Sequence, residues 1–360
     1  MQFPGKRCRT LFLKRSNLNP KYKLTMNKPI DFRSPTHNLS EVLFNVKLQD
    51  VYSDFRFPNT LFNLPIGTPD YRAVVNQSNG QIISIVSKNY QLISNQKAVE
   101  MGKEIFAQIY PSVNADELIP YKVVAPNSKA SAHIDLIHES VNFKVWDQET
   151  WLPFLRTTNS YNRSVALSFE IGFVRKLCSN GVLFNKDTMK LKYIHNRSNK
   201  MEIRSDAKQI EAAFGLFADQ CVSLRDYPVP KELMFALVCQ ILNINLELPK
   251  DNQVNKKINS LQNLMELTKI LTARYTTELG SNAYAAFNLV TDIVSHQDQY
   301  RNLTGYYFNV RSYFSKPTDW MDDFSNITKD KGFEYTNYLR ETIDKLERIR
   351  QHTKLEWELN

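Results

Sequence analysis

The stretch YRAVVNQSNGQIISIVSKNYQLISNQKAVEMGKEIFAQIYP, residues 71–111, decides how this chain folds. Its first half holds two β-branched runs, 71–76 and 81–87, and Asn79-Gly80 between them supplies the positive φ that a tight hairpin turn needs. Its second half, 95–110, has apolar residues at helical spacing, with Asn95 as the expected N-cap and Pro111 as the stop. The sequence therefore predicts a β-hairpin that leads into an α-helix.

The pattern downstream of this stretch changes once. Short segments rich in β-formers come first, with polar breaks between them, at 122–125, 131–138, 142–146, 152–157, 164–173 and 182–184. Beyond about residue 205 the apolar period is 3.6, which predicts helices from Asp206 onward and over 231–242, 258–271, 282–296 and 334–355. We expect an α+β fold: a largely antiparallel sheet with a hairpin-helix start, followed by a helical layer.

These patterns divide the chain into four regions. Residues 1–25 form a basic leader, 26–204 a β-rich α+β region, 205–299 a helical region, and 300–360 an aromatic-basic segment with a C-terminal amphipathic helix. The leader is interpreted as a disordered or incidental extension, a nucleic-acid arm or a targeting segment, and Met26 is a second possible start. We expect its deletion to leave the melting temperature unchanged, because it shows no periodic apolar face.

Charge and composition bound the classes of function. The net charge of the 360 residues is +9, and the leader with its seven Lys and Arg and no acid carries most of it, so the body is nearly neutral. No apolar run approaches the roughly 20 residues that cross a bilayer. The four cysteines have wide, irregular spacings, which favours reduced thiols over a disulfide framework. We expect a cytoplasmic protein without membrane contact.

Catalytic motifs are missing from the sequence. It contains no Cys-x-x-Cys pair, no phosphate-binding glycine loop and no nucleophile elbow, so we expect no metal, no cofactor and no catalytic residue. Two alternatives to packing stay open. His133 and Asp135 share one face of a strand and would suit proton transfer, and Arg175 and Lys176 would activate the thiol of Cys178.

Two polar segments suggest a nucleic-acid ligand. The run 156–164 concentrates guanidinium and amide groups that suit phosphates, although an ordinary hairpin loop has a similar composition. The segment 300–320 mixes aromatic rings with cations, as single-strand binding proteins do, although aromatic clusters also form cores. The predicted nucleic-acid-binding residues are Arg156, Asn159, Asn162, Arg163, Arg175, Arg301, Tyr306, Tyr307, Arg311 and Tyr313.

Three segments carry a resemblance to a known family. They are SKNYQLI at 87–93, RKLCSNG at 175–181 and AAFNLVTDIVSH at 285–296. In this order they resemble the phage/plasmid-like protein family, a domain-of-unknown-function family of bacteriophages, plasmids and integrated elements. The resemblance implies a genetic setting, the handling of DNA in a mobile element or interference with a host defence. The order of strands and helices also loosely resembles ring-forming single-strand annealing proteins.

Three functions follow as hypotheses. The first is a non-enzymatic mobile-element protein that binds single-stranded DNA or assists its annealing. The alternative is a protein-binding module that antagonises a host defence or restriction system, and the third is a metal-independent nuclease or phosphodiesterase that uses His133 and Asp135. The apolar stripe of the final helix covers either its own core or a second copy, and we expect a homo-oligomer.

Overall fold

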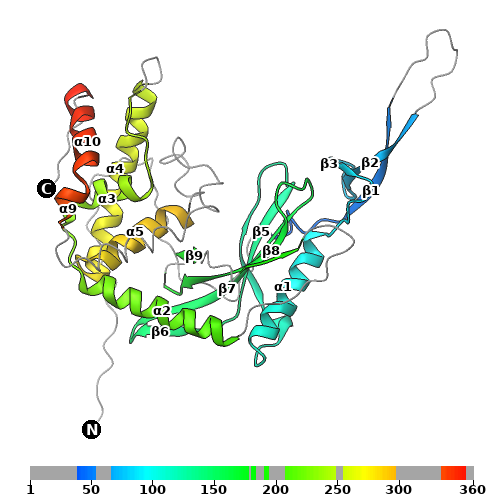
Figure 1. Cartoon of the computed structure of the whole chain (residues 1–360), viewed down its shortest axis with the longest axis horizontal. Helices are drawn as coiled ribbons and strands as arrows, with labels where there is room; N and C mark the ends of the chain where they lie inside the picture. The colour runs from blue at the N-terminus through cyan, green and yellow to red at the C-terminus, as the bar shows by residue number, and fades with distance from the viewer. Residues whose placement is uncertain are drawn as a thin grey trace.

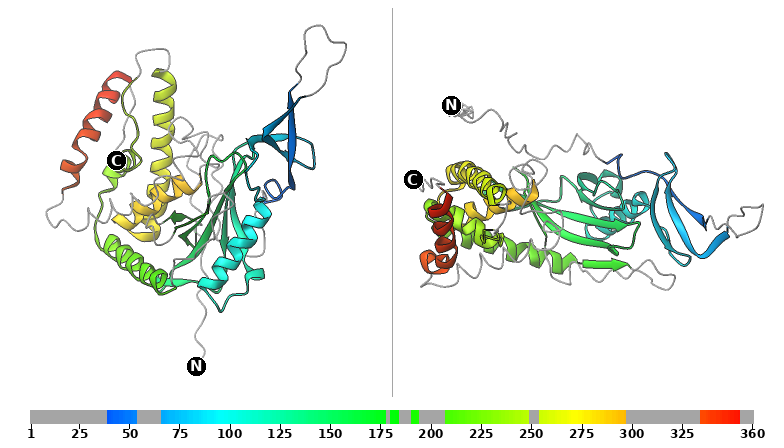
Figure 2. Two further views of the ribbon diagram at one scale, coloured as in Figure 1. Left: turned by 45° about the vertical axis from the view of Figure 1, so that its right-hand side comes forward. Right: turned by 90° about the horizontal axis from the view of Figure 1, so that it is seen from above.

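The computed structural model describes residues 39–53, 66–177, 180–183, 190–193, 207–248, 254–296 and 334–353. Along these residues the chain passes from a small sheet through a large sheet to a layer of helices. Figure 2 shows the small sheet and the helical layer at opposite ends, with the large sheet between them. The basic leader, Cys178, and the aromatic-basic residues from Arg301 to Tyr313 lie outside the described residues.

The small sheet contains the predicted hairpin. Strands β1 (Val46–Ser53), β2 (Ile66–Asn76) and β3 (Ile82–Ser87) pair antiparallel in the order β1-β2-β3. Gly80 in the turn has a φ of +72°, as the Asn-Gly pair predicts. This sheet projects from the body (Figure 1). The hairpin is confirmed, and β1 is a strand that the sequence reading missed.

Helix α1 (Asn95–Ile109) follows the hairpin as predicted, but its cap differs by one residue. Ser94 is the N-cap, and its side chain accepts a hydrogen bond from the backbone N–H of Lys97. The predicted cap, Asn95, is buried, and its amide donates to the carbonyl oxygen of Val42 at 2.9 Å. Asn95 therefore joins the helix to the chain that precedes the small sheet.

The large sheet has seven strands, all in antiparallel pairs. Its main path runs β10-β8-β7-β5-β4, with β6 paired to β7 and β9 paired to β8. The bounds are β4 (Ile119–Val124), β5 (Ser131–Ile137), β6 (Phe143–Trp146), β7 (Glu149–Ser160), β8 (Leu167–Arg175), β9 (Gly181–Leu183) and β10 (Lys190–Tyr193). A short 3-10 turn, η1 (Ala115–Glu117), precedes β4. The predicted α+β class is confirmed.

The helical layer consists of α2 (Ala207–Asp226), η3 (Lys231–Leu233), α3 (Met234–Ile241), α4 (Val254–Leu279), α5 (Ala283–Ser295), α9 (Tyr335–Tyr338) and α10 (Arg340–Thr353). Helix α5 is buried along its whole length. On α10 the apolar residues Leu346 and Ile349 are buried in the core cluster that also contains α3. The final helix therefore docks on its own chain, which removes the apolar stripe as an argument for assembly.

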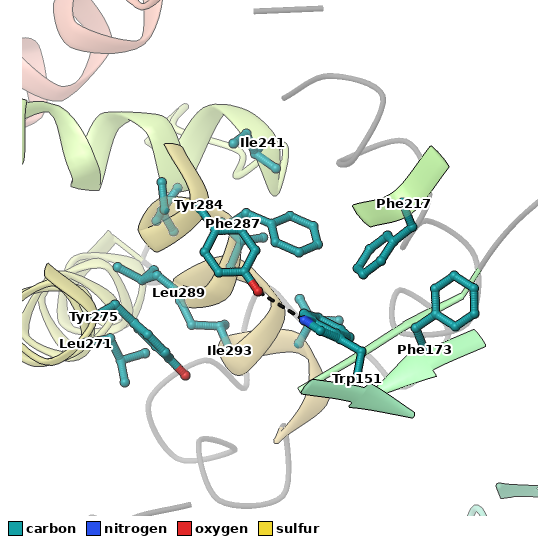
Figure 3. Packing of buried hydrophobic residues seen from close by; sticks show 14 of the residues in the cluster. Trp151, Phe173, Phe217, Ile241, Leu271, Tyr275, Tyr284, Phe287, Leu289 and Ile293 are labelled. Carbon is teal, nitrogen blue, oxygen red and sulfur yellow. Dashed lines mark hydrogen bonds between the residues drawn. The ribbon is translucent and has the colours of Figure 1, made fainter. Parts of the chain in front are cut away.

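Aromatic side chains join the large sheet to the helices. Trp151 on β7 lies edge-on to Phe217 of α2 at 4.8 Å between ring centroids, and its indole N–H donates to the hydroxyl of Tyr284 on α5 (Figure 3). Trp151, Phe217 and Tyr284 are all fully buried. No helix among the described residues is long and apolar enough to span a membrane.

Candidate functional site

The polar run 156–164 is divided between a strand and a turn. Residues 156–160 belong to β7 and are buried, so they are not the exposed loop that the sequence suggested. The turn begins at Tyr161, and Asn162 and Arg163 are exposed on it. Arg163 has a φ of +60°, in the left-handed region that a tight turn uses. Only the second half of the run is therefore open to a ligand.

Arg156 is committed to a buried ion pair. Its Nε and Nη2 donate to the two carboxylate oxygens of Asp135, each at 2.6 Å, and both side chains are 2% exposed. The register of β5 and β7 places the two residues directly opposite each other. A guanidinium held by two charge-assisted bonds inside the protein does not present itself to a phosphate. The prediction that Arg156 contacts nucleic acid does not fit this placement.

Asn159 is also internal. Its amide nitrogen donates to the carbonyl oxygen of Ile93 at 3.0 Å and to the Oδ1 of Asn95 at 2.9 Å. These bonds hold the start of α1 against β7, because buried polar groups favour hydrogen-bonded partners. Asn159 stabilises the junction between helix and sheet, and like Arg156 it is not on the surface.

His133 and Asp135 share a face of β5, as the sequence predicts, but they take different partners. Asp135 bonds to Arg156, and the Nδ1 of His133 lies 2.8 Å from the hydroxyl of Thr158. Burial, together with the charge of Arg156, lowers the pKa of His133 to about 3. A neutral histidine beside a carboxylate that is engaged elsewhere has the geometry of a structural group, and the proton-transfer pair is not assembled here.

Arg175 lies in a second buried cluster, centred on Glu149. Its Nε and Nη2 donate to Glu149 at 2.5 and 2.8 Å, and its Nη2 also donates to Glu278 of α4 at 2.6 Å. Trp151 and Tyr284 donate to the same Oε1 of Glu149 at 3.0 and 2.5 Å. This network ties β7 and β8 to α4 and α5. The predicted nucleic-acid contact of Arg175 is therefore replaced by internal ones.

A third cluster is centred on Asp292 of α5. Its carboxylate accepts from the hydroxyl of Tyr275 at 2.6 Å and from the Nδ1 of His296 at 3.0 Å, with Arg274 at 3.5 Å. Burial alone would raise the pKa of the Asp292 carboxyl, but its hydrogen bonds and the charges of His296 and Arg274 outweigh burial and lower that pKa. Asp292 therefore stays anionic although it is buried.

Two segments of the family resemblance meet at these clusters. Asn180, from 175–181, donates to the hydroxyl of Tyr275 at 3.0 Å and to the carbonyl oxygen of Asn288 at 3.1 Å. Asn288 and Asp292 belong to 285–296 on α5. These segments are therefore brought together by hydrogen bonds that fasten the helical layer to the sheet.

Three exposed large apolar side chains lie together elsewhere, on the outer face of the small sheet. We use outer face for the residues that the strand register places on one side: Lys47, Gln49, Tyr71, Ala73, Val75, Ile82, Ile85 and Ser87. Tyr71, Ile82 and Ile85 are 55, 60 and 51% exposed. The opposite face is packed, with Val74 and Val86 buried against Tyr90 and Tyr161.

Sequence reasoning treated the hairpin as structure only and missed this face. The signal was present in the alternation of β3, IISIVS, where apolar residues occupy both faces of the strand. A strand that buries one apolar face and carries a second one must expose it or bury it in a partner.

The polar turn borders the small sheet. Ser84 of β3 donates to the carbonyl oxygen of Tyr161 at 2.6 Å, and Tyr90 donates to the carbonyl oxygen of Ser160 at 3.0 Å. Asn162 and Arg163, the two exposed members of the predicted set, follow directly after this contact. Ser84 pairs with Val74 of the packed face, so the turn with Asn162 and Arg163 borders the small sheet on the side opposite Ile85.

A family model described as a domain of unknown function, DUF932, matches residues 82–319. The chain belongs to the DUF932 family. The DUF932 match covers the large sheet and the clusters around Glu149 and Asp292, but only β3 of the small sheet. No curated protein and no solved structure matches the chain.

Proposed function

We propose that this DUF932 protein belongs to a phage, plasmid or other mobile element and binds single-stranded nucleic acid through the outer face of its small sheet. The observation that carries the proposal is the grouping of Tyr71, Ile82 and Ile85 on one sheet face, each more than half exposed around the buried Ala73 and Val75. Lys47 lies on the same face. A ring for stacking, aliphatic surface and one cation suit unpaired bases joined by phosphates.

A single strand fits this face better than a duplex. Bases of a duplex are stacked on one another and offer only their edges, whereas an unpaired base can lay its whole ring on Tyr71 or on the isoleucine side chains. The positive charge of the outer face is small, because Lys47 is its one formally charged residue among the eight that define it. Affinity for phosphates alone, which drives duplex binding without sequence preference, would be weak here.

The proposal is tested by fluorescence anisotropy with a labelled oligonucleotide of mixed sequence. Tyr71→Ala removes one stacked base and is expected to weaken binding by about 1 to 3 kcal/mol, roughly 5- to 150-fold. Lys47→Ala is expected to weaken binding and to reduce the salt slope by about 0.7, the value for one phosphate contact on a single strand. Lys269→Ala, an exposed cation on α4, is the matched control and should change neither.

Equal affinity of the wild type and Tyr71→Ala would refute the proposed interface. The comparison must include the melting temperature of each variant. Tyr71 and Lys47 are exposed, so neither substitution should alter folding by more than about 0.5 kcal/mol.

A protein partner is the second candidate function, and one feature of the same face favours it. Ile82 and Ile85 are aliphatic, and an exposed aliphatic patch with little charge is typical of protein interfaces. This would be the host-defence antagonist considered from the sequence. A protein-binding function predicts no saturable oligonucleotide binding at low salt. In cells, Ile85→Asp should abolish antagonism of the host defence, whereas Lys269→Ala should behave as the wild type.

A further inference from the structure

A side-chain cluster beside β4, an edge strand of the large sheet, lies outside every site described above. Strands β4 and β5 pair with Ile119 opposite Ile137. This register brings the residues just before β4 next to those just after β5, so Glu117 at the end of η1 meets His138. The chain then turns, with the N–H of Val141 donating to the carbonyl oxygen of His138, and presents Ser140.

Three hydrogen bonds fix the tautomer of His138. The backbone N–H of Ser140 points to its Nδ1 at 3.3 Å, and a backbone N–H can only donate, so Nδ1 carries a lone pair. The proton is then on Nε2, which donates to the carboxylate of Glu117 at 3.2 Å. The hydroxyl of Ser140 lies 2.7 Å from Nδ1 and therefore donates its proton to it. Nucleophile, base and orienting carboxylate are arranged in series.

We propose that Ser140 is an acyl-accepting nucleophile activated by His138, with Glu117 as the positioning residue. The Oγ of Ser140 attacks the carbonyl carbon of an ester while its proton passes to Nδ1 of His138. The carbon–oxygen bond to the leaving alcohol then breaks, and the imidazolium returns the proton to that alcohol. Water, activated by the same nitrogen, attacks the acyl-serine and releases the carboxylic acid and free Ser140.

The surroundings select the class of ester. The three side chains line an open cavity of about 390 Å³ together with Ile119 and Glu139. Two carboxylates in the lining, from Glu117 and Glu139, repel anions, and Ile119 offers one apolar contact. The site therefore takes small neutral or cationic carboxylic esters and rejects phosphodiesters, which separates it from the nucleic-acid interface.

The test uses 4-nitrophenyl acetate for turnover and a fluorophosphonate probe for covalent capture. The full chain should release 4-nitrophenolate with an initial burst, and the probe should label the peptide that contains Ser140. Ser140→Ala and His138→Asn should each lower kcat/KM at least about 100-fold, the lower range of general-base catalysis, and should abolish labelling. Glu117→Gln should lower kcat with KM unchanged, because it removes the charge that stabilises the imidazolium.

The matched control is Ser128→Ala, an exposed loop serine whose hydroxyl oxygen accepts from the backbone N–H of Ala130, and it should react as wild type. Unchanged melting temperatures exclude loss of the fold as the cause of any change. Labelling at another residue, or turnover that survives Ser140→Ala, overturns the assignment. Hydrolysis of bis(4-nitrophenyl) phosphate that depends on Ser140 overturns the ester class.

Discussion

The buried pair of Arg156 and Asp135 allows a structural role to be separated from a ligand-binding one. The two side chains are 2% exposed and share two bonds of 2.6 Å. In Arg156→Met the carboxylate of Asp135 stays buried without its guanidinium, and in Asp135→Leu the guanidinium loses its carboxylate. Breaking a buried pair in this way costs about 3 to 5 kcal/mol. Each single variant should therefore be strongly destabilised.

The double variant Arg156→Met/Asp135→Leu should be more stable than either single variant. It removes both charges and leaves apolar groups on a face that already packs Phe154 at 5.5 Å from the guanidinium. Replacing both partners of a buried pair with apolar groups is often neutral. With roughly 2 to 4 °C per kcal/mol for a domain of 150 to 250 residues, the single variants should melt about 6 to 20 °C lower.

Urea and thermal unfolding of the four proteins complete the double-mutant cycle, and anisotropy with the labelled oligonucleotide is measured on each at a temperature where all are folded. Folded Arg156→Met should bind as the wild type does. Single variants within about 0.5 kcal/mol of the wild type would show that the pair contributes nothing. A normal stability with reduced oligonucleotide affinity would restore Arg156 to the ligand and refute the structural reasoning.

The other predictions concern three further places in the core. The unfolded state takes up a proton on His133 near pH 6.5 and the folded state only near pH 3, so stability is lost as pH falls below about 6.5. In His133→Gln the free energy of unfolding should fall less steeply with decreasing pH, by up to about 1.4 kcal/mol per pH unit, as measured in urea titrations at a series of fixed pH values. Gly102→Ala should destabilise despite its better helix propensity, because the new methyl meets the hydroxyl of Thr157, and Thr157→Ala should restore most of the loss in the melting temperature. Burial raises the pKa of the Cys221 and Cys239 thiols, so iodoacetamide at neutral pH should modify neither in the native protein and both after denaturation, as mapped by mass spectrometry.

Most of the fold could be read from local patterns. The Asn79-Gly80 turn, the helical spacing of α1 and the change of period beyond residue 205 all act within a few residues, and each appears in the structure. Strand β1 escaped because its register shifts between Asp50 and Tyr52, which interrupts the alternation of Val46 and Leu48. The cap of α1 was misplaced because Ser94 and Asn95 are both good caps, and only tertiary contacts of Asn95 decide between them.

The candidate site was less predictable, for a physical reason. A run of polar residues is usually solvated, so Arg156, Asn159 and Arg175 suggested a ligand. Their partners are distant in sequence: Asp135 precedes Arg156 by 21 residues and Glu149 precedes Arg175 by 26. Strand register makes these pairs, and a shift of one residue would turn every side chain to the other face. Arg163 remains on the surface because it lies in the turn, where no strand opposes it.

The distribution of charge decides how the proposed nucleic-acid binding must depend on salt. Arg156 and Arg175 are used inside the protein, so Lys47 is the formally charged residue that the outer face of the small sheet offers to phosphates. One contact to a single strand gives a slope of log affinity against log salt of about −0.7. The seven cations of residues 1–25 would instead contribute up to about −4.9, which is 7 × 0.7. A shallow salt slope together with an affinity that falls in Tyr71→Ala therefore supports binding by stacking on the small sheet. A steep salt slope with an affinity that Tyr71→Ala leaves unchanged would assign binding to the basic leader and refute the proposed interface.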